Sequence, residues 1–234
     1  MGDATETKKV LGTQAVDRFV RDGMRLGLGT GSTAIWAARR VGALLAEGKL
    51  KGIRAVTTSL QTELEARALG IPVVTLNDAA LDCTLDLTID GADEVDPERN
   101  LIKGGGGALL MEKIVAYASR SLLIIVDDSK LSARLCDRFA IPVEIVANAL
   151  EPVSRKLREL GGEVSLRIAV RKAGPVVTDL GNLLLDVTFR RSFDPRTMED
   201  ELKLIPGVLE DGLFTRKRPE LLIGHPDGSV EHRK

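Results

Sequence analysis

One stretch of the chain decides the fold: MRLGLGTGST at residues 24–33. Residues 24–28 form a short apolar run that predicts a buried strand, and residues 34–46 predict the helix that follows. Between them lies a loop of glycine, threonine and serine. Such a loop presents backbone N–H groups and the positive end of a helix dipole to an anion. The stretch therefore predicts an α/β unit with an anion site at its centre.

The loop differs from two better-known nucleotide loops. Ser32 stands where the dinucleotide fingerprint has its third glycine, and no Gly-Lys-Ser/Thr sequence ends the loop as in a Walker A motif. We interpret it as a site for a phosphate monoester, and an ordinary turn with Ser/Thr caps is the alternative. The candidate phosphate-binding residues are Thr30, Gly31, Ser32 and Thr33.

Strands and helices alternate on both sides of this stretch. Further strands are expected at residues 53–57, 72–76, 85–89 and 122–126, and helices at residues 8–20, 60–69 and 108–119. The alternation predicts an α/β fold with a Rossmann-like, mostly parallel sheet covered by helices on both faces. Ligands of such sheets bind at the carboxyl ends of the strands.

The simple alternation of strands and helices ends at about residue 142. Residues 143–212 follow the order β-α-β-β-α-β, which is typical of a ferredoxin-like α+β unit. We therefore expect two domains: a catalytic sheet domain of residues 1–134 plus 211–234, and an inserted small α+β domain of residues 135–210 that serves as a lid or interface.

Composition excludes several classes of function. The 234 residues carry a net charge of −1, which argues against a nucleic-acid-binding surface. No apolar run approaches the ~18 residues of a membrane span, and the N-terminus lacks the apolar core of a signal peptide. Cys83 and Cys136 have no metal-type or redox-type spacing, which suggests buried thiols in a reducing, cytoplasmic setting. His225 and His232 lie in the last ten residues, which argues against a Ser–His pair or a histidine metal site.

A second glycine-rich stretch, IKGGGGALLMEK at residues 102–113, is a candidate functional site. A flexible loop is the simple interpretation of four consecutive glycines. Their neighbours indicate a site instead, because Lys103 precedes them, Glu112 follows them, and Asp90-Gly91-Ala92-Asp93 lies just upstream. Mg²⁺ binding by Asp90 and Asp93 is an alternative, but proton transfer or hydroxyl binding suits these carboxylates better.

Glu112 is expected about one turn into a helix, outside a buried stripe of Leu110, Ile114 and Ala118 that Leu109 and Val115 widen. Because helical side chains lean toward the N-terminus, its carboxylate is expected to reach back over the glycines. The alternative is a surface glutamate that favours the positive end of the helix.

The chain resembles the ribose-5-phosphate isomerases of type A. The matching segments are residues 27–34 (GLGTGSTA), 89–94 (IDGADE), 102–114 (IKGGGGALLMEKI), Asp127-x-Ser129-Lys130, 142–144 (PVE), 205–208 (IPGV) and 212–214 (GLF). They occur in family order and cover nearly the whole chain.

The resemblance implies interconversion of D-ribose 5-phosphate and D-ribulose 5-phosphate through an enediolate, in the non-oxidative pentose phosphate pathway, without a metal or organic cofactor. It implies Glu112 as the base, and Asp90, Lys103 and Asp93 in ring opening and in handling the sugar oxygens. Substrate contacts are implied for Lys9, Thr30, Gly31, Ser32, Thr33, Asp90, Gly91, Ala92, Asp93, Lys103, Gly104, Gly105, Gly106 and Lys130. It also implies a homodimer or homotetramer, with no nucleic-acid or membrane partner.

Two other classes of protein remain as alternatives. A non-catalytic sugar-phosphate sensor shares this architecture, but no helix-turn-helix segment precedes the predicted sheet. An aminosugar-phosphate isomerase-deaminase or a CoA transferase is the other, and the former would be expected to use a histidine in its site.

Overall fold

The computed structural model describes residues 4–234. By its internal contacts the chain forms two compact units. Unit 1 contains the chain up to Gly91 together with Met111–Lys130 and Pro219–Lys234, and unit 2 contains Ala92–Leu110 and Leu131–Arg218. The division into a catalytic sheet domain of residues 1–134 plus 211–234 and a small domain of residues 135–210 stays a prediction. Among the helices of residues 4–234, none is long and apolar enough to cross a membrane.

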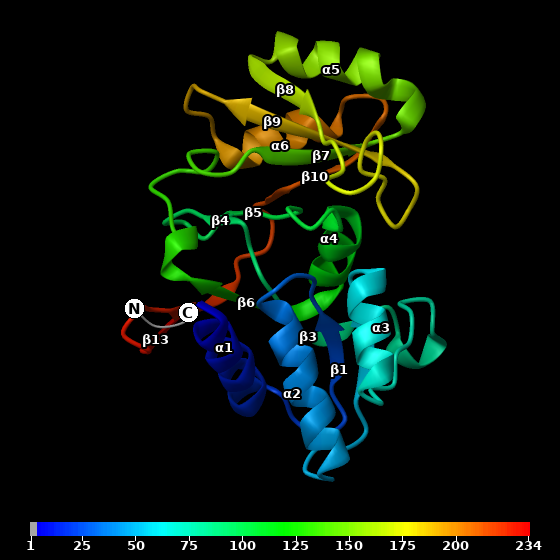
Figure 1. Cartoon of the computed structure of the whole chain (residues 1–234), viewed down its shortest axis with the longest axis vertical. Helices are drawn as coiled ribbons and strands as arrows, with labels where there is room; N and C mark the ends of the chain where they lie inside the picture. Colours follow the sequence, from blue (N-terminus) through cyan, green and yellow to red (C-terminus); the bar gives the residue numbers. More distant parts are fainter. Residues whose placement is uncertain (1–3) are drawn as a thin grey trace. The chain divides into compact units, whose positions relative to one another are not determined.

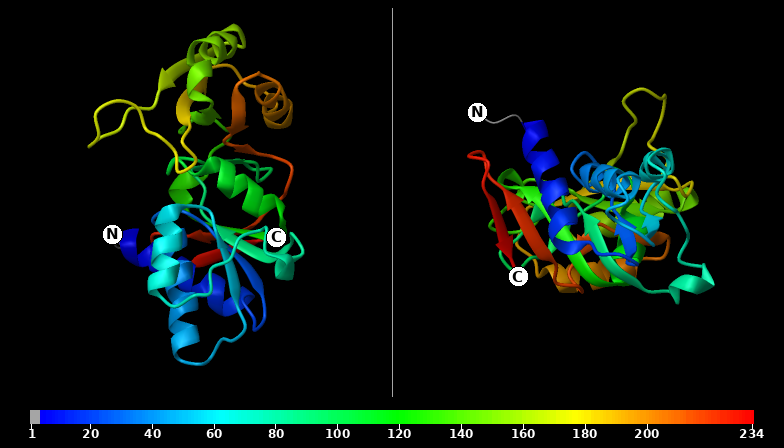
Figure 2. Two further views of the ribbon diagram at one scale, coloured as in Figure 1. Left: turned by 90° about the vertical axis from the view of Figure 1, so that its right-hand side faces the viewer. Right: turned by 90° about the horizontal axis from the view of Figure 1, so that it is seen from below.

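Unit 1 is built on a six-stranded sheet. Its strands are β1 (Arg25–Leu28), β2 (Arg54–Thr57), β3 (Leu85–Asp90), β6 (Ser119–Asp127), β12 (Glu220–Gly224) and β13 (Val230–Arg233). They lie in the order β13-β12-β6-β3-β1-β2 (Figure 1). Every neighbouring pair is parallel except the hairpin of β12 and β13, drawn in red in Figure 2. The predicted parallel α/β sheet is confirmed.

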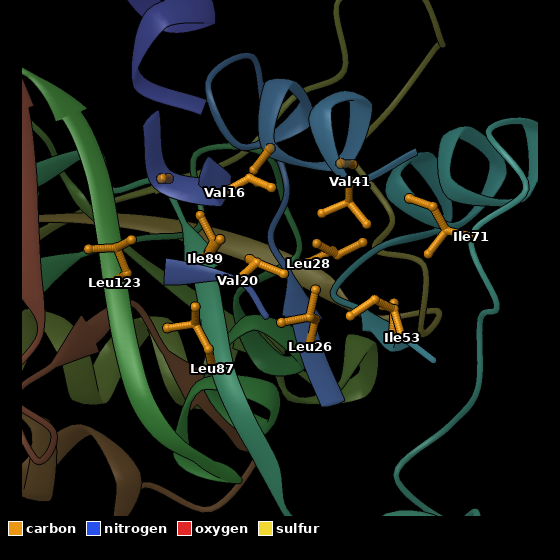
Figure 3. Packing of buried hydrophobic residues seen from close by; sticks show 14 of the residues in the cluster. Val16, Val20, Leu26, Leu28, Val41, Ile53, Ile71, Leu87, Ile89 and Leu123 are labelled. Carbon is orange, nitrogen blue, oxygen red and sulfur yellow. The ribbon is translucent and has the colours of Figure 1, made fainter. Parts of the chain in front are cut away.

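Helices cover both faces of this sheet. They are α1 (Ala4–Phe19), α2 (Ala34–Ala46), α3 (Leu60–Ala68) and α4 (Leu109–Tyr117), with short 3₁₀ turns η1 (Ala79–Leu81) and η2 (Asp128–Lys130). On one face, Val16 of α1 and Val41 of α2 pack with sheet residues such as Leu28 and Ile89 (Figure 3). On the other, Val115 of α4 belongs to a smaller cluster. Each fully buried aliphatic side chain contributes about 1.5–3 kcal/mol, so these two layers hold the strands in place.

The strand predicted at residues 72–76 is wrong. Only one bridge forms there, between Ala55 and Val73. Ala55 N donates to Pro72 O and Val74 N donates to Ala55 O, both at 2.9 Å. Pro72 has no N–H to extend the ladder, and the chain turns back at once, where Asp78 N donates to Thr75 O at 3.0 Å.

Unit 2 contains the predicted ferredoxin-like arrangement. Its elements are β7 (Ile141–Ile145), η3 (Ala147–Ala149), α5 (Leu150–Glu159), β8 (Gly162–Leu166), β9 (Leu183–Phe189), α6 (Pro195–Lys203) and β10 (Val208–Asp211). The strand order is β10-β7-β9-β8, antiparallel throughout. Both helices are amphipathic, and Val153 and Leu157 of α5 and Leu202 of α6 are fully buried in one core with Leu185 of β9. A second, three-stranded sheet is formed by β4 (Glu94–Val95), β5 (Leu101–Ile102) and β11 (Leu213–Phe214).

The strand predicted at residues 164–170 ends early, at Leu166. Residues 167–182 leave the sheet as an excursion between β8 and β9, within the yellow segment of Figure 2. One isolated bridge, between Ile168 and Pro175, pairs its two arms, and another, between Val177 and Leu183, joins its return segment to the start of β9. Val170, at the far part of the first arm, is 99% exposed. The apolar residues after Leu166 suggested a longer strand, but this segment does not pack on the sheet.

A buried carboxylate holds one loop of unit 2. Glu94, on β4, is fully buried and accepts a hydrogen bond from the Ser132 hydroxyl. Its two oxygens also accept four successive backbone N–H groups, from Cys136 at 2.9 Å, Asp137 at 3.2 Å, Arg138 at 3.0 Å and Phe139 at 3.3 Å. Charge-assisted hydrogen bonds of this kind are about twice as strong as neutral ones. Glu94 therefore determines the conformation of residues 136–139.

We expect Glu94→Gln to lower the free energy of unfolding by about 3 kcal/mol, because an amide nitrogen replaces one acceptor oxygen and leaves buried N–H donors unpaired. The measurement is the midpoint of urea unfolding. Glu98→Gln makes the same chemical change at an exposed position four residues away and should leave the midpoint unchanged. Equal midpoints for Glu94→Gln and the wild-type protein would contradict this account of the loop.

Candidate active site

The carboxyl ends of the parallel strands gather most of the unit 1 candidates at one edge of the sheet. Residues 29–33 follow β1, Gly91 follows β3, and η2 with Lys130 follows β6. The strand order β2-β1-β3-β6 means that the connections after β1 and β3 leave in opposite directions. Such a switch point is where open α/β sheets bind their ligands. The predicted location of the unit 1 residues at the carboxyl edge is confirmed.

Gly29 and Asp90 share one small space at this switch point. Gly29 N donates to Ile89 O at 2.9 Å, which holds the end of β1 against β3. A Cβ atom on Gly29 would lie 2.0 Å from Asp90 Oδ1 and 2.7 Å from Asp90 Cα. Asp90 is fully buried, and its Oδ1 accepts the N–H of Gly91 at 2.7 Å. Glycine is therefore required at position 29 to make room for the aspartate.

A network of hydroxyl groups supports the loop after β1. Thr30 Oγ1 lies 2.7 Å from both Thr58 Oγ1 and Ser59 Oγ. Ser59 caps α3 by accepting the N–H of Thr62 at 3.2 Å, and the Thr62 hydroxyl donates to Gly29 O at 2.9 Å. Sequence reasoning singled out Thr30 and missed the other three. Residues 57–59 (Thr-Thr-Ser) at the end of β2 were a usable signal in the sequence, because β2 is the parallel neighbour of β1 and the two strands end at the same edge.

The remainder of the loop leads into α2. Gly31 has a φ of +105°, a conformation that glycine adopts without strain, and its carbonyl accepts the N–H of Ile35 at 3.1 Å. Thr33, the N-cap residue, makes no capping hydrogen bond with its side chain. The N-terminus of α2 keeps the geometry that suits a phosphate group.

The two neighbouring lysines of α1 differ. Lys8 Nζ donates to Ser32 Oγ at 2.9 Å, whereas Lys9 Nζ lies 3.7 Å from Glu6 of its own helix. We predicted Lys9 as a substrate contact, and that role stays a prediction. Sequence reasoning missed Lys8, which contacts Ser32 in the loop after β1.

The glycine turn, defined as Gly104–Gly107, belongs to unit 2. Gly107 N donates to Gly104 O at 2.9 Å, which closes a four-residue turn. Only its first and last residues have positive φ values, +102° at Gly104 and +78° at Gly107. Gly105 N donates to Asp93 Oδ2 at 2.7 Å, and a Cβ on Gly105 would lie 2.6 Å from Asp93 Oδ1. Asp93, a predicted catalytic residue, thus contacts the glycine turn within unit 2.

Lys103, directly before the turn, is 2% exposed although it carries a charge. Its backbone N–H donates to Gly212 O at 2.9 Å, and its Nζ lies 5.7 Å from the centroid of the Phe214 ring. A cation over an aromatic face gains electrostatic stabilisation, more so when it is removed from water. Burial of a lysine ammonium is costly and is typical of functional positions.

Glu112 lies on the buried face of α4, contrary to the prediction. The helix buries Leu109, Glu112, Val115 and Ala116, whereas Ile114 is 43% exposed. Glu112 itself is only 5% exposed. The prediction is confirmed for Leu109 and Val115 and wrong for Ile114. It assumed that apolar residues alone define the buried face, whereas Glu112 and Lys113 are also buried. The reach of Glu112 over the glycine turn stays a prediction.

Chain connectivity links the candidates of the two units. Asp90-Gly91 ends the unit 1 segment and Ala92-Asp93 continues directly into unit 2, while α4 begins in unit 2 and carries Glu112 in unit 1. Within residues 4–234, no three His, Cys, Asp or Glu side chains are grouped in a way that would hold a metal ion.

The fold and these residues define an α/β protein with a Gly/Thr/Ser loop at the switch point of its sheet and several buried ionisable side chains. A family model described as ribose 5-phosphate isomerase A (phosphoriboisomerase A) matches residues 54–228. The chain belongs to this family. The sequence prediction of the family is confirmed.

Individual relatives agree over almost the full length. The ribose-5-phosphate isomerase A of Treponema denticola is 45% identical over 98% of this chain and 99% of its own. That of Synechococcus sp. (strain WH7803) is 49% identical over 96% and 93%.

Solved structures also agree. That of ribose 5-phosphate isomerase A from Methanocaldococcus jannaschii has 40% identity and a TM-score of 0.92, covering 99% of this chain and 100% of its own. A D-ribose-5-phosphate isomerase in complex with phospho-erythronic acid has 39% identity and a TM-score of 0.94, covering both chains completely.

The close approach of Gly29 and Asp90 generates a prediction about stability. Gly29→Ala should lower the free energy of unfolding by about 1–3 kcal/mol, because its Cβ would overlap backbone and carboxylate atoms of Asp90. Gly91→Ala is the matched control on the other side of Asp90, since its Cβ would have Ile125 O as its nearest contact at 3.9 Å. Urea unfolding of both variants compares them. Equal stability of the two variants would show that the space beside Asp90 does not require glycine at position 29.

Proposed function

We infer that this chain interconverts D-ribose 5-phosphate and D-ribulose 5-phosphate as an aldose–ketose isomerase. The observation that carries this inference is family membership over almost the whole chain, at 45–49% identity to curated isomerases of this type. The predicted sequence motifs of the family are complete in this chain, from residues 27–34 to residues 212–214. The reaction belongs to the non-oxidative pentose phosphate pathway.

We propose Glu112 as the base that moves the proton between C1 and C2. The reaction needs a group that removes a proton from one carbon and returns it to the next, which a carboxylate can do through an enediolate. Glu112 is 5% exposed, so few water molecules can compete for the proton. Its place on the buried face of α4 supports this role over that of a surface glutamate.

We propose Lys103 and the glycine turn as the group that stabilises the enediolate oxygen. Negative charge that develops on oxygen is best stabilised by donors that are already oriented. Lys103 supplies a buried ammonium, and we propose the N–H of Gly106 as the backbone donor of the turn, because those of Gly105 and Gly107 donate to Asp93 and to Gly104 O. Asp90 and Asp93 are proposed to handle the ring oxygen and hydroxyl protons during ring opening. Gly91 and Ala92 join these two carboxylates and are proposed to contact the sugar.

We propose the loop after β1 as the phosphate site. Residues 30–33 lie at the N-terminus of α2, which carries a partial positive charge, and Lys8 contacts Ser32 from α1. Lys9 and Lys130 are further proposed contacts. The Lys8 ammonium and the positive end of α2 would together offset the negative charge of a phosphate monoester.

The ligand of the related complex fits the proposed chemistry. Phospho-erythronic acid combines a phosphate with a planar carboxylate. An enediolate is also planar around the carbons that exchange the proton, with its charge on oxygen. We propose that the compound binds this chain as a mimic of the intermediate. We also propose a cytoplasmic location and a homodimer or homotetramer, as the sequence predicted.

The activity is tested directly with enzyme that has been treated exhaustively with EDTA. We expect full turnover of ribose 5-phosphate in a coupled assay, because the proposed reaction uses no metal or organic cofactor. Activity that disappears and returns only with Mg²⁺ would revive the metal interpretation of Asp90 and Asp93. Binding of ribose 5-phosphate without turnover would favour a sugar-phosphate sensor.

Glu112→Gln tests the base. The amide keeps the size of the side chain but cannot accept the proton, so kcat should fall by about 10²–10⁴-fold while the affinity for phospho-erythronic acid changes little. Steady-state kinetics and a competition assay measure the two quantities. Glu201→Gln, at an exposed position on α6, is the control and should retain wild-type kcat. A kcat of Glu112→Gln near that of the wild-type enzyme would remove Glu112 as the base.

A further inference from the structure

An arginine far along the chain holds the carbonyl side of the glycine turn. Arg167 Nη1 donates to Gly104 O at 2.8 Å and to Gly105 O at 3.3 Å. Arg167 follows β8 at the start of the excursion between β8 and β9, and it belongs to unit 2 together with the turn. It was not among the residues that the sequence predicted for the site.

Arg167 is itself held firmly. Its Nε donates to Asp186 Oδ2 at 2.9 Å and its Nη2 donates to Asp186 Oδ1, so the two side chains form a bidentate pair. Arg167 N donates to Leu184 O at 2.9 Å, and Val176 N donates to Arg167 O at 2.9 Å. Asp186 lies on β9, which is paired on both sides, with Pro142 of β7 and Ser165 of β8 as its neighbours. The guanidinium thus has a fixed place relative to the four-stranded sheet.

The contacts determine the direction of the peptide groups in the turn. The peptide between Gly104 and Gly105 is tied at both ends, its carbonyl to Arg167 and its N–H to Asp93. The next peptide directs the carbonyl of Gly105 toward Arg167. In a planar trans peptide the N–H points opposite to the carbonyl, so the N–H of Gly106 is directed away from the guanidinium. A cation at the carbonyl end also polarises the amide and strengthens its N–H as a donor.

We propose that Arg167 and Asp186 are positioning residues for catalysis, which orient the glycine turn so that the N–H of Gly106 receives the enediolate oxygen. The proposal rests on the proposed function, because the isomerase reaction supplies the oxygen that develops charge. Four glycines without such a contact have many accessible conformations, and donors that must first be ordered stabilise the transition state less.

The chemistry requires arginine at this position. A guanidinium has five N–H donors in a planar fork, which is enough to bind both oxygens of Asp186 and still donate to two carbonyls. A lysine ammonium is a single point with three donors and cannot span the carboxylate and the turn in this geometry. The bidentate pair with Asp186 in turn fixes the orientation of the guanidinium plane.

Kinetics of Arg167→Met test the proposal. We expect kcat for ribose 5-phosphate to fall about 10²-fold, as for a small misplacement of catalytic groups, while KM changes by less than about threefold. Affinity for phospho-erythronic acid should fall in parallel with kcat, because that ligand mimics the intermediate, whereas affinity for inorganic phosphate should stay the same. Arg167→Lys should recover little of the lost kcat, and millimolar guanidinium chloride should recover part of it in Arg167→Ala.

Arg190→Met is the matched control. Arg190 forms an equivalent bidentate pair on the same sheet, with Nε and Nη2 donating to Glu163 at 2.8 and 2.9 Å, and both side chains are exposed. It should keep wild-type kcat. Thermal midpoints of all variants separate loss of stability from loss of positioning.

The inference is overturned if Arg167→Met retains wild-type kcat, or if the kcat values of Arg167→Met and Arg190→Met fall together in proportion to their thermal midpoints. A wild-type protein that does not isomerise ribose 5-phosphate would instead refute the proposed function. The two failures are therefore distinguishable.

Discussion

The close approach of β1 and β3 at their carboxyl ends is the constraint on which the unit 1 part of the site depends. A buried carboxylate, Asp90, ends β3, and the absence of a side chain at Gly29 leaves it room. The same approach is held by the hydrogen bond from Gly29 N to Ile89 O. The chain leaves β1 toward β2 and leaves β3 toward β6, on opposite sides. A ligand can therefore bind between the loop after β1 and the turn after β3.

The buried ionisable residues Glu94, Lys103 and Glu112 differ in their surroundings. Glu94 is satisfied by four backbone N–H groups and a hydroxyl, so its charge stabilises a loop. Lys103 and Glu112 are also nearly excluded from water, but on segments that adjoin the glycine turn in sequence. Burial of charge is costly, so its retention in these segments is consistent with chemistry rather than with packing.

The glycine turn shows how a glycine-rich segment is given one conformation. Asp93 accepts the N–H of Gly105, and Arg167 donates to two carbonyls. Glycine at positions 104 and 107 permits the positive φ values, and the side chains around the turn remove the remaining freedom. These tertiary contacts restrict the four consecutive glycines, and they favour a defined turn over the flexible-loop interpretation.

The sequence by itself determined the parallel α/β sheet, the ferredoxin-like unit, the family and most of the candidate residues, because hydrophobic periodicity and glycine-rich motifs are local signals. Only the tertiary structure decided that residues 72–76 do not form a strand, that Glu112 lies on the buried face of α4, and that Lys8 contacts Ser32. It alone brought Arg167 to Gly104, which is 63 residues away. A hydrogen bond over such a separation depends on how β8 and β9 pair, and no local pattern encodes that pairing.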